Sequence, residues 1–570
     1  MRTLFVVLVA LCQIGVASAA TLPKPVRDAL KRANIPLSSI GVVVQQTDAR
    51  TPLYSINARQ GMNPASTIKL LTTFSALETL GPAYQWKTEA YLDGKLKDGV
   101  LHGNLLFKGY GNPKFTIEQF WLWLRELRQR GLQDIRGDLV LDHSFFEPTS
   151  HDAAEFDSDP TRAYNVGPNA LLLNFNALHL RLIPEVVPGL SPGLNPDSAA
   201  SGTSPTTALL QPDLSGYQIT NRIITTARLP CHASNTYRAR LEARHIVLEG
   251  TIPLNCGEVE DYFSLLSHND YFFAVFSALW KELGGALQGQ VREGSAPIAQ
   301  PVFSTHLSPQ LSEVIRDINK FSNNIMARQL FLTLGTAAPA PVPLVLDREI
   351  SATKKISSDT DSLSEPDTDI AATPVPASSP LKVDNLLSNR LDAALPPLAD
   401  APQPGSPLEK LETLPAPIST STSPDVSHSG TASIARSTLA VQHWLGKQQL
   451  RFPELVLENG AGLSRKERIS AQHLADLLQL ATHSRFAAEL EASLPILGID
   501  GSVKKRFKGK SIAGYAHLKT GTLEGVKSLA GYVQSHSGKQ WIVVFIINHP
   551  HAAAGQDAQD ALIEWLQTLH

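Results

Sequence analysis

A serine and a lysine three residues apart offer one route to nucleophilic catalysis. Ser66 and Lys69 follow the turn signal Asn63-Pro64-Ala65 and open a long apolar-periodic segment, which predicts that both side chains lie on one face of a helix start. A serine hydroxyl attacks a carbonyl only when a base removes its proton, and backbone N–H groups at a helix start help to hold an oxyanion. The pattern alone is equally typical of a capping serine beside an exposed lysine. Ser-x-x-Lys also occurs in settings that position it poorly. Ser351 and Ser379 lie in a Pro-rich stretch, and Ser502 precedes a cationic run.

A second serine lies in Ser322-Asn323-Asn324. Its hydroxyl can pass a proton between a lysine and a departing amine, and an asparagine amide can grip a peptide carbonyl or the lysine itself. The alternative interpretation is a Ser/Asn cluster that caps a helix. The same Ser-x-Asn spacing recurs at Ser55-Ile56-Asn57 and Ser267-His268-Asn269, and residue type alone excludes neither.

The third pattern is Lys519-Thr520-Gly521-Thr522, which contains the chain's one Lys-Thr-Gly triplet. It lies on a strand signal, where Gly521 lets another backbone approach closely and Lys519 can bind a carboxylate. The alternative is an edge strand that a lysine protects from pairing.

The elements that must position these residues have the periodicities of a mixed α/β protein. The sequence predicts helices and strands alternating at both ends of the chain, with a single helix over 309–334. The other helices are expected at 24–33, 67–80, 271–283, 434–447, 471–482 and 558–569, and strands at 40–45, 53–56, 516–520, 526–534 and 540–548. Between about 84 and 261, short strands with Gly and Pro turns predict a β-rich domain inserted after the first long helix.

Residues 336–430 differ in composition from the rest of the chain. They hold 15 of the 39 prolines, no Phe, Tyr or Trp, and 13 acidic against 6 basic residues. Such a segment cannot bury enough apolar surface to offset the entropy of ordering, so we expect a disordered insertion.

The N-terminus predicts export. Arg2 precedes an apolar run that ends in Ala17-Ser18-Ala19, as in a cleaved signal peptide of residues 1–19. The alternative is an uncleaved membrane anchor, although the run is short for one. Of the two cysteines that remain, Cys231 and Cys256, a disulfide is expected in an oxidising compartment, with two separate buried thiols as the alternative.

The overall composition excludes several classes. With a net charge of −3 and few cysteines among 570 residues, no global basic field points to nucleic acid and no multi-cysteine metal or iron–sulfur site can form. The histidines show no zinc-binding spacing, so we expect neither a metal nor another cofactor.

Together, and in this order, the three patterns resemble the active-site set of penicillin-recognising serine enzymes. Four longer blocks narrow the resemblance to the D-Ala-D-Ala carboxypeptidase/endopeptidase family (peptidase S13, class C low-molecular-mass penicillin-binding protein 4 type): 319–324, 458–465, 498–502 and 519–526, the last continued by 529–533. The resemblance implies an α/β (α+β) transpeptidase-like domain, an antiparallel sheet flanked by helices, with the β-rich accessory domain inserted. Its expected segments are 20–84, 262–335 and 431–570, with the accessory domain at 85–261 and the insertion at 336–430, for which the family offers no counterpart.

The resemblance also implies roles. Ser66 forms the acyl-enzyme on peptidoglycan peptides, Lys69 acts as general base and Ser322 protonates the leaving amine. The remaining positions bind substrate. Asn324 binds its amide, and Lys519 and Thr520 bind its carboxylate. Gly521 follows them in the same substrate-binding strand, and the backbone N–H groups of Thr522 and Ser66 bind the oxyanion. β-Lactam antibiotics would acylate the same serine. The location would be periplasmic, either free or peripheral to the membrane, and the oligomeric state, including a homodimer, stays open. Asn323 stands where the family usually has Asp, which predicts altered tuning without loss of activity.

Three alternatives stay open. A serine β-lactamase shares the chemistry but must release its acyl group quickly, and a related esterase or amidase uses the same scaffold. The third is a catalytically silent cell-wall binding protein, against which the intact Ser66, Lys69, Ser322 and Lys519 argue.

Overall fold

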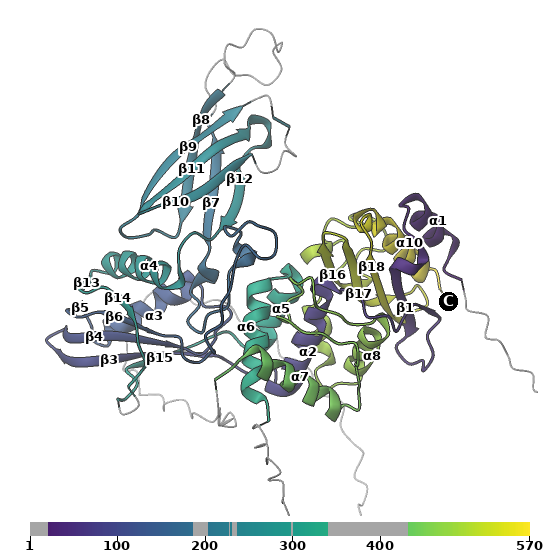
Figure 1. The fold of residues 1–570 in the computed structure, drawn as a ribbon, viewed down its shortest axis with the longest axis horizontal. Coiled ribbons are helices and arrows are strands. Elements are labelled where there is room, and N and C mark those ends of the chain that lie inside the picture. Colours follow the sequence, from purple (N-terminus) through teal and green to yellow (C-terminus); the bar gives the residue numbers. More distant parts are fainter. Residues whose placement is uncertain are drawn as a thin grey trace, which may run out of the picture. The chain divides into compact units, whose positions relative to one another are not determined.

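The computed structural model describes residues 21–185, 203–226, 229–230, 236–297, 300–339 and 431–569. Its first layer is an antiparallel sheet built from the two ends of the chain (Figure 1). The strand order is β16 (Ala516–Leu523), β17 (Val526–Gln534), β18 (Gln540–Asn548), β1 (Ile40–Gln46) and β2 (Tyr54–Ile56). The strands expected from the sequence are therefore confirmed, and β16 lies at an edge.

The apolar run of β18 explains why helices cover both faces of this sheet. Alternate residues of a strand point to opposite faces, and Val544 and Ile546 enter one hydrophobic cluster while Val543 and Phe545 enter another. Each such side chain contributes about 1.5–3 kcal/mol when fully buried. The second cluster includes α1 (Lys24–Arg32) and α10 (Gln556–Gln567). The first includes α2 (Lys69–Leu80), α5 (Leu311–Phe321), α6 (Asn324–Leu334), α7 (Ile434–Lys447), α8 (Ala471–Thr482) and α9 (Ala487–Ser493).

The single helix expected over 309–334 is wrong in one respect, because the structure breaks it at Ser322. Ser322 has φ 56° and ψ 35°, a left-handed conformation that a helix cannot continue through. Asn323 then begins α6, since its side-chain oxygen accepts the N–H of Met326 at 3.1 Å. The capping interpretation of this cluster is therefore confirmed for Asn323.

The described residues of the insertion after α2 form two sheets and two α-helices (Figure 1). One sheet packs against α3 (Ile117–Gln129) and α4 (His268–Glu282) through an apolar cluster that includes Phe107, Phe120 and Phe276. Its strands are β3 (Lys87–Lys97), β4 (Val100–Gly109), β5 (Asp134–Ile135), β6 (Leu139–Asp142), β13 (Ala286–Leu287), β14 (Val291–Glu293) and β15 (Ser304–Leu307). The other sheet holds β7 (Leu178–Pro184), β8 (Thr203–Gln211), β9 (Gln218–Thr226), β10 (Tyr237–Glu242), β11 (His245–Pro253) and β12 (Val259–Phe263).

The insertion ends later than the sequence pattern suggested. Residues 262–335 were assigned to the transpeptidase-like domain, but β15 pairs with β3 and α4 packs in the core of the insertion. Leu311, at the start of α5, is the point at which side chains rejoin the core of the first sheet. The C-terminal end of the insertion therefore lies at about 307 and not at 261. The helical periodicity of 271–283 predicts a helix but does not indicate which hydrophobic core that helix covers.

Several expectations fall on other parts of the chain. The export signal at 1–19, most of the segment 336–430 and Cys231 lie outside the described residues. Cys256 is disulfide-bonded, so two separate thiols are excluded for it, while its pairing with Cys231 stays a prediction. No helix among the described residues is long and apolar enough to cross a membrane.

Candidate active site

Ser66 lies in a short 3-10 helix, Ala65–Ile68, that leads directly into α2. The preceding Ala65 is fully buried with φ +45°, a strained conformation for a residue with a side chain. Asn63 holds it there, because its side-chain oxygen accepts the N–H of Ala65 at 2.9 Å. Gly521 packs against the same turn: a Cβ on it would lie 2.8 Å from the Ser66 nitrogen. The nucleophile is thus fixed by backbone contacts on both sides.

Lys69 is fully buried at the start of α2, and its ammonium meets three oxygens. Nζ donates to Ser66 Oγ at 2.9 Å, to Asn324 Oδ1 at 2.7 Å and to the Ala461 carbonyl. Burial lowers the pKa of Lys69 well below its usual value, and the nearby charge of Lys519 lowers it further. An ammonium with a lowered pKa loses one of these protons readily, and the neutral amine can then accept the proton of the serine hydroxyl, as a general base must.

Lys519 and Ser322 form a second pair. Lys519 Nζ donates to Ser322 Oγ at 2.8 Å and to the carbonyl of Thr520 at 2.9 Å. Burial lowers the pKa of Lys519 to about 7. Although β16 is an edge strand, Lys519 is fully buried, so it does not serve as a solvent-exposed guard of the edge.

The two asparagines have separate tasks. Asn324 places its side-chain oxygen on Lys69, which leaves its amide N–H groups for a substrate carbonyl. Asn323 caps α6, a task that Asp performs equally well. This structural role explains why the departure from the family pattern at 323 leaves the geometry of Ser322 and Asn324 intact.

The remaining residues of the third pattern line β16. Thr520 is half-buried, Gly521 is buried and Thr522 is exposed. Ser502, which the sequence pattern placed in a solvated cationic loop, lies 2.8 Å from Thr520 through the two hydroxyl oxygens. Ser502 is itself exposed, as expected for a residue before a cationic run, and its hydroxyl lies at the edge of the site.

Folding thus brings Ser66, Lys69, Ser322, Asn324 and Lys519 together from three distant segments. The competing motifs lie elsewhere or cannot be placed. Ser267 caps α4 in the insertion by accepting the N–H of Asp270, Ser55 belongs to β2, and Ser351 and Ser379 lie outside the described residues.

Sequence reasoning missed the segment from Glu458 to Glu467 as part of the site. Residues 458–465 served only as one of the blocks that carry the family resemblance, although this segment supplies the Ala461 carbonyl to Lys69. Gly462 has φ +81°, and a Cβ there would lie 2.1 Å from the carbonyl oxygen of Ala65. Two glycines in Gly460-Ala461-Gly462 were the available signal, since closely packed backbones require them.

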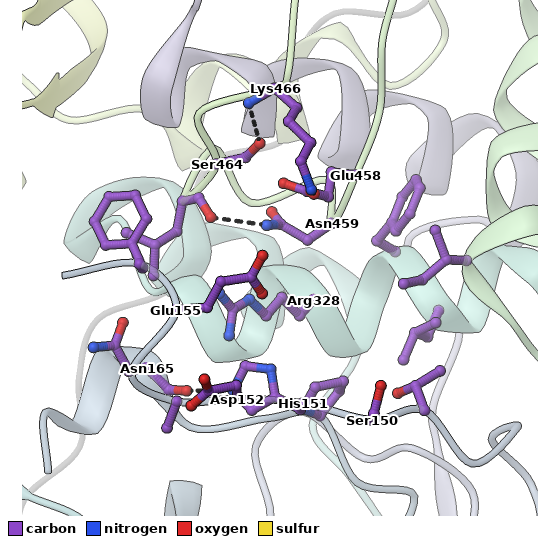
Figure 2. Close-up of a pocket in the computed structure, with 18 of the residues that line it drawn as sticks. Ser150, His151, Asp152, Glu155, Asn165, Arg328, Glu458, Asn459, Ser464 and Lys466 are labelled. Atoms are coloured by element: carbon purple, nitrogen blue, oxygen red, sulfur yellow. Dashed lines mark hydrogen bonds and ion pairs between the residues drawn. The ribbon is translucent and has the colours of Figure 1, made fainter. Parts of the chain in front are cut away.

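A cavity of about 320 Å³ lies on another side of this segment (Figure 2). Arg328 lies between Glu458 and Asn459 on one wall and His151 and Asp152 on the other. Ser66, Lys69, Ser322 and Lys519 are not among its lining residues. The cavity therefore adjoins the loop that contacts Lys69 without containing the nucleophile.

The fold and the site define a serine enzyme of the penicillin-recognising class. A family model described as the D-Ala-D-Ala carboxypeptidase 3 (S13) family matches residues 22–411 and 424–569. The chain belongs to this family.

Relatives of known name agree with this assignment. D-alanyl-D-alanine carboxypeptidase DacB of Haemophilus influenzae is 22% identical over 515 residues, which cover 90% of this chain and 85% of that protein. The D-alanyl-D-alanine carboxypeptidase of Actinomadura sp. (strain R39) is 24% identical over 538 residues, 92% of this chain and 80% of that protein. The crystal structure of penicillin binding protein 4 (dacB) from Haemophilus influenzae superimposes with a TM-score of 0.64 at 20% identity, over 94% of this chain and 99% of that chain. The superposition establishes the shared fold.

Proposed function

We propose that this protein hydrolyses the D-Ala-D-Ala bond of peptidoglycan stem peptides through an acyl-enzyme on Ser66, and that penicillins acylate the same hydroxyl. The observation that carries the proposal is the pair of contacts Lys69 Nζ–Ser66 Oγ, 2.9 Å, and Lys519 Nζ–Ser322 Oγ, 2.8 Å, made by two fully buried lysines. Each lysine contacts a hydroxyl that must lose or gain a proton during acyl transfer.

In the first step, the neutral amine of Lys69 takes the proton of Ser66 while Oγ attacks the carbonyl of the penultimate D-alanine. The oxyanion forms near the backbone N–H groups of Ser66 and Thr522, which are proposed to bind it. Asn324 orients the substrate amide with its free N–H groups.

In the second step, the tetrahedral intermediate expels the amine of the terminal D-alanine. The proton reaches that amine through Ser322, which Lys519 contacts. With a pKa of about 7, Lys519 exchanges a proton readily near neutral pH, and its charged form attracts the terminal carboxylate together with Thr520. Water then attacks the ester carbonyl and gives a proton to Lys69, which passes it to Ser66 Oγ as the C–Oγ bond breaks and the shortened peptide leaves.

The cellular setting is also proposed. The leader at residues 1–19 has the pattern of an export signal, and the substrate occurs outside the cytoplasmic membrane, so the enzyme would work in the periplasm. Peptidoglycan cross-links that end in the same D-Ala bond would be cut by the same site.

The test is to incubate the exported chain, residues 20–570, with cross-linked muropeptides and with a penicillin, and to follow both by mass. We expect loss of one alanine from pentapeptides, conversion of cross-linked dimers to monomers, and a penicilloyl adduct on the peptide containing Ser66. A penicilloyl adduct that turns over within seconds, with muropeptides unchanged, would instead indicate a β-lactamase.

A further inference from the structure

Glu467 is a fully buried carboxylate beside the catalytic lysine that the mechanism above does not use. Its Oε1 accepts three successive backbone N–H groups, from Glu458 at 3.3 Å, Asn459 at 3.0 Å and Gly460 at 2.8 Å. Its Oε2 is buried and has no hydrogen-bond partner in the described part of the chain. Burial raises the pKa of Glu467, and the three N–H groups that converge on Oε1 oppose that shift by stabilising the carboxylate.

The turn that Glu467 holds touches the catalytic helix at three points. The carbonyl of Gly460 accepts the hydroxyl of Thr72 at 2.7 Å, and the carbonyl of Ala461 accepts from Lys69. Gly462 packs on the nucleophile's own turn, where a Cβ would lie 2.7 Å from the Ser66 nitrogen. The turn therefore fixes both members of the Ser66–Lys69 pair.

Lys69 needs such a guide because its amine can rotate. A primary amine has three tetrahedral positions, and two of them point at Ala461 and Asn324. With those two occupied, the third position faces Ser66 Oγ. A shift of the Ala461 carbonyl would free the amine to turn away from the serine, and small displacements of reacting groups are expensive in rate.

Charge gives Glu467 a second effect on the same amine. The charged groups that act on Lys69 are Lys519, Glu467 and Arg328; the two cations lower its pKa and Glu467 raises it. Burial lowers the pKa of Arg328, and the nearby Glu467 and Glu458 raise it. In its charged form, Glu467 thus partly compensates a buried cationic cluster.

We propose that Glu467 is a positioning residue for acyl transfer: it anchors the 458–462 turn so that the Ala461 carbonyl directs the amine of Lys69 toward Ser66. The inference rests on the proposed function, in which Lys69 is the base. It adds a residue that neither contacts the substrate nor donates to the nucleophile.

The experiment compares Glu467→Gln with Glu454→Gln in the full-length exported chain. Glu454 is a matched control because it is also largely buried and hydrogen-bonded, but to Ser470 and His473. The readout is the rate constant for acylation of Ser66 by a chromogenic β-lactam from pH 5 to pH 10, together with the melting temperature. We expect E467Q to acylate about 10- to 100-fold more slowly. The acid limb of the pH profile, where the acylation rate rises as Lys69 loses its proton, should move to lower pH because the loss of the anion lowers the pKa of Lys69. E454Q should keep the wild-type limb and rate even if it melts earlier.

A purely structural role for Glu467 would lower the melting temperature and leave the pH profile in place, and that result would overturn the proposal. Thr72→Val provides an independent test if E467Q does not fold, since it loosens the same turn from α2 without changing charge. Slower acylation at an unmoved acid limb is expected for T72V, and wild-type acylation would overturn the positioning role. If wild-type protein itself forms no adduct on Ser66, the proposed function fails; if it does and E467Q matches it, only the present inference fails.

Discussion

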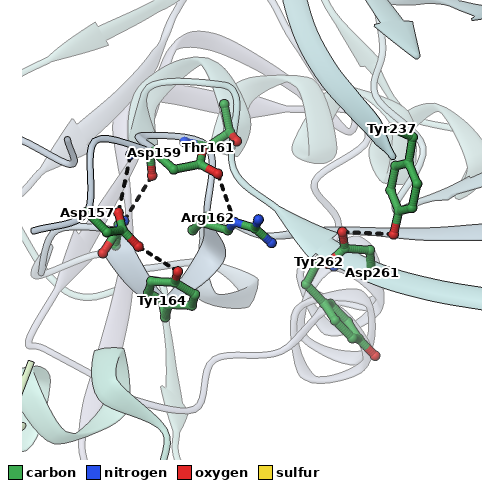
Figure 3. A network of polar contacts seen from close by, with 9 residues as sticks. Asp157, Asp159, Thr161, Arg162, Tyr164, Tyr237, Asp261 and Tyr262 are labelled. Carbon is green, nitrogen blue, oxygen red and sulfur yellow. Dashed lines mark hydrogen bonds and ion pairs between the residues drawn. The ribbon is translucent and has the colours of Figure 1, made fainter. Parts of the chain in front are cut away.

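Cationic side chains have different kinds of hydrogen-bond partner in two regions of the molecule. In the polar network of the insertion, Arg162 donates to the Asp159 carboxylate at 2.8 Å, and neighbouring carboxylates accept from tyrosine hydroxyls (Figure 3). Beside Ser66, the partners of the fully buried Lys69 and Lys519 within the described ranges are hydroxyl, amide and carbonyl oxygens.

The difference separates structural charges from reactive ones. A carboxylate partner favours the charged form, and it raises the pKa of Arg162. Neutral oxygens compensate burial less well, so Lys69 and Lys519 have lowered pKa values. The active site thus gives up stability to keep two amines that lose a proton more readily than an exposed lysine does.

The largest effect that tests this contrast is expected for Lys69→Met, which keeps the volume of the side chain and removes the amine. Without a base, acylation of Ser66 by a chromogenic β-lactam should slow by about 10³-fold or more. Stopped-flow absorbance measures the rate, and circular dichroism checks that the variant is folded. Acylation within tenfold of wild type would show that another group takes the proton.

The second largest effect is expected for Lys519→Met. Loss of the group that contacts Ser322 and attracts the terminal carboxylate should lower kcat/KM on a D-Ala-D-Ala peptide by about 10²-fold. Stability should move the other way, by about 1–4 kcal/mol, because a buried charge is replaced by an apolar side chain.

The pH dependence of the stability gain in K519M tests whether burial of the Lys519 charge is its cause. The folded-state pKa of Lys519 is about 7 and the ordinary value is 10.5, so between these pH values the unfolded chain binds the extra proton. Wild type therefore bears the full cost of the buried charge below pH 7 and loses that cost as the pH rises toward 10.5. Chemical denaturation at pH 6 and pH 9 should show a smaller gap between K519M and wild type at pH 9. An equal gap at both would mean that Lys519 is not desolvated in the folded state.

Much of this site was accessible from residue types and spacing. The alternation in β18 and the apolar periodicity of α2 located the central sheet and helix, and Ser66, Lys69, Ser322 and Lys519 all meet as the sequence patterns implied. Ser502 and Glu467 could not be found in that way, because their partners lie 18 residues away in one case and in backbone N–H groups in the other. Periodicity also missed the left-handed turn at Ser322, since apolar spacing continues through the break in 311–334.

In the insertion, Tyr237→Phe should have a modest effect confined to stability. It removes the hydrogen bond from Tyr237 Oη to Asp261 Oδ2, 3.0 Å, at a cost of about 1–2 kcal/mol. The acylation rate of Ser66 should stay unchanged, because this region holds its charges in pairs and none of them reaches the lysine cluster. Thermal unfolding and the β-lactam assay measure the two quantities on the same sample. Slower acylation with little change in melting temperature would contradict the claim that the charges of the insertion do not act on Lys69 and Lys519.

The smallest effect is expected for Asn323→Asp, which restores the residue usual in the family. The side chain of Asn323 accepts the N–H of Met326 and starts α6, and a carboxylate at the same position accepts that bond and interacts favourably with the helix N-terminus. Stability should therefore rise by no more than about 0.5–1 kcal/mol, and acylation should stay within about twofold of wild type, because the added charge points into the helix cap while Asn324 keeps its oxygen on Lys69. The pH profile is the sensitive measurement: an anion close enough to act on Lys69 would move the acid limb to higher pH, the reverse of the shift expected for E467Q. An unmoved limb in N323D beside a shifted limb in E467Q would assign the electrostatic control of the base to the 458–467 segment and the helix cap to 323.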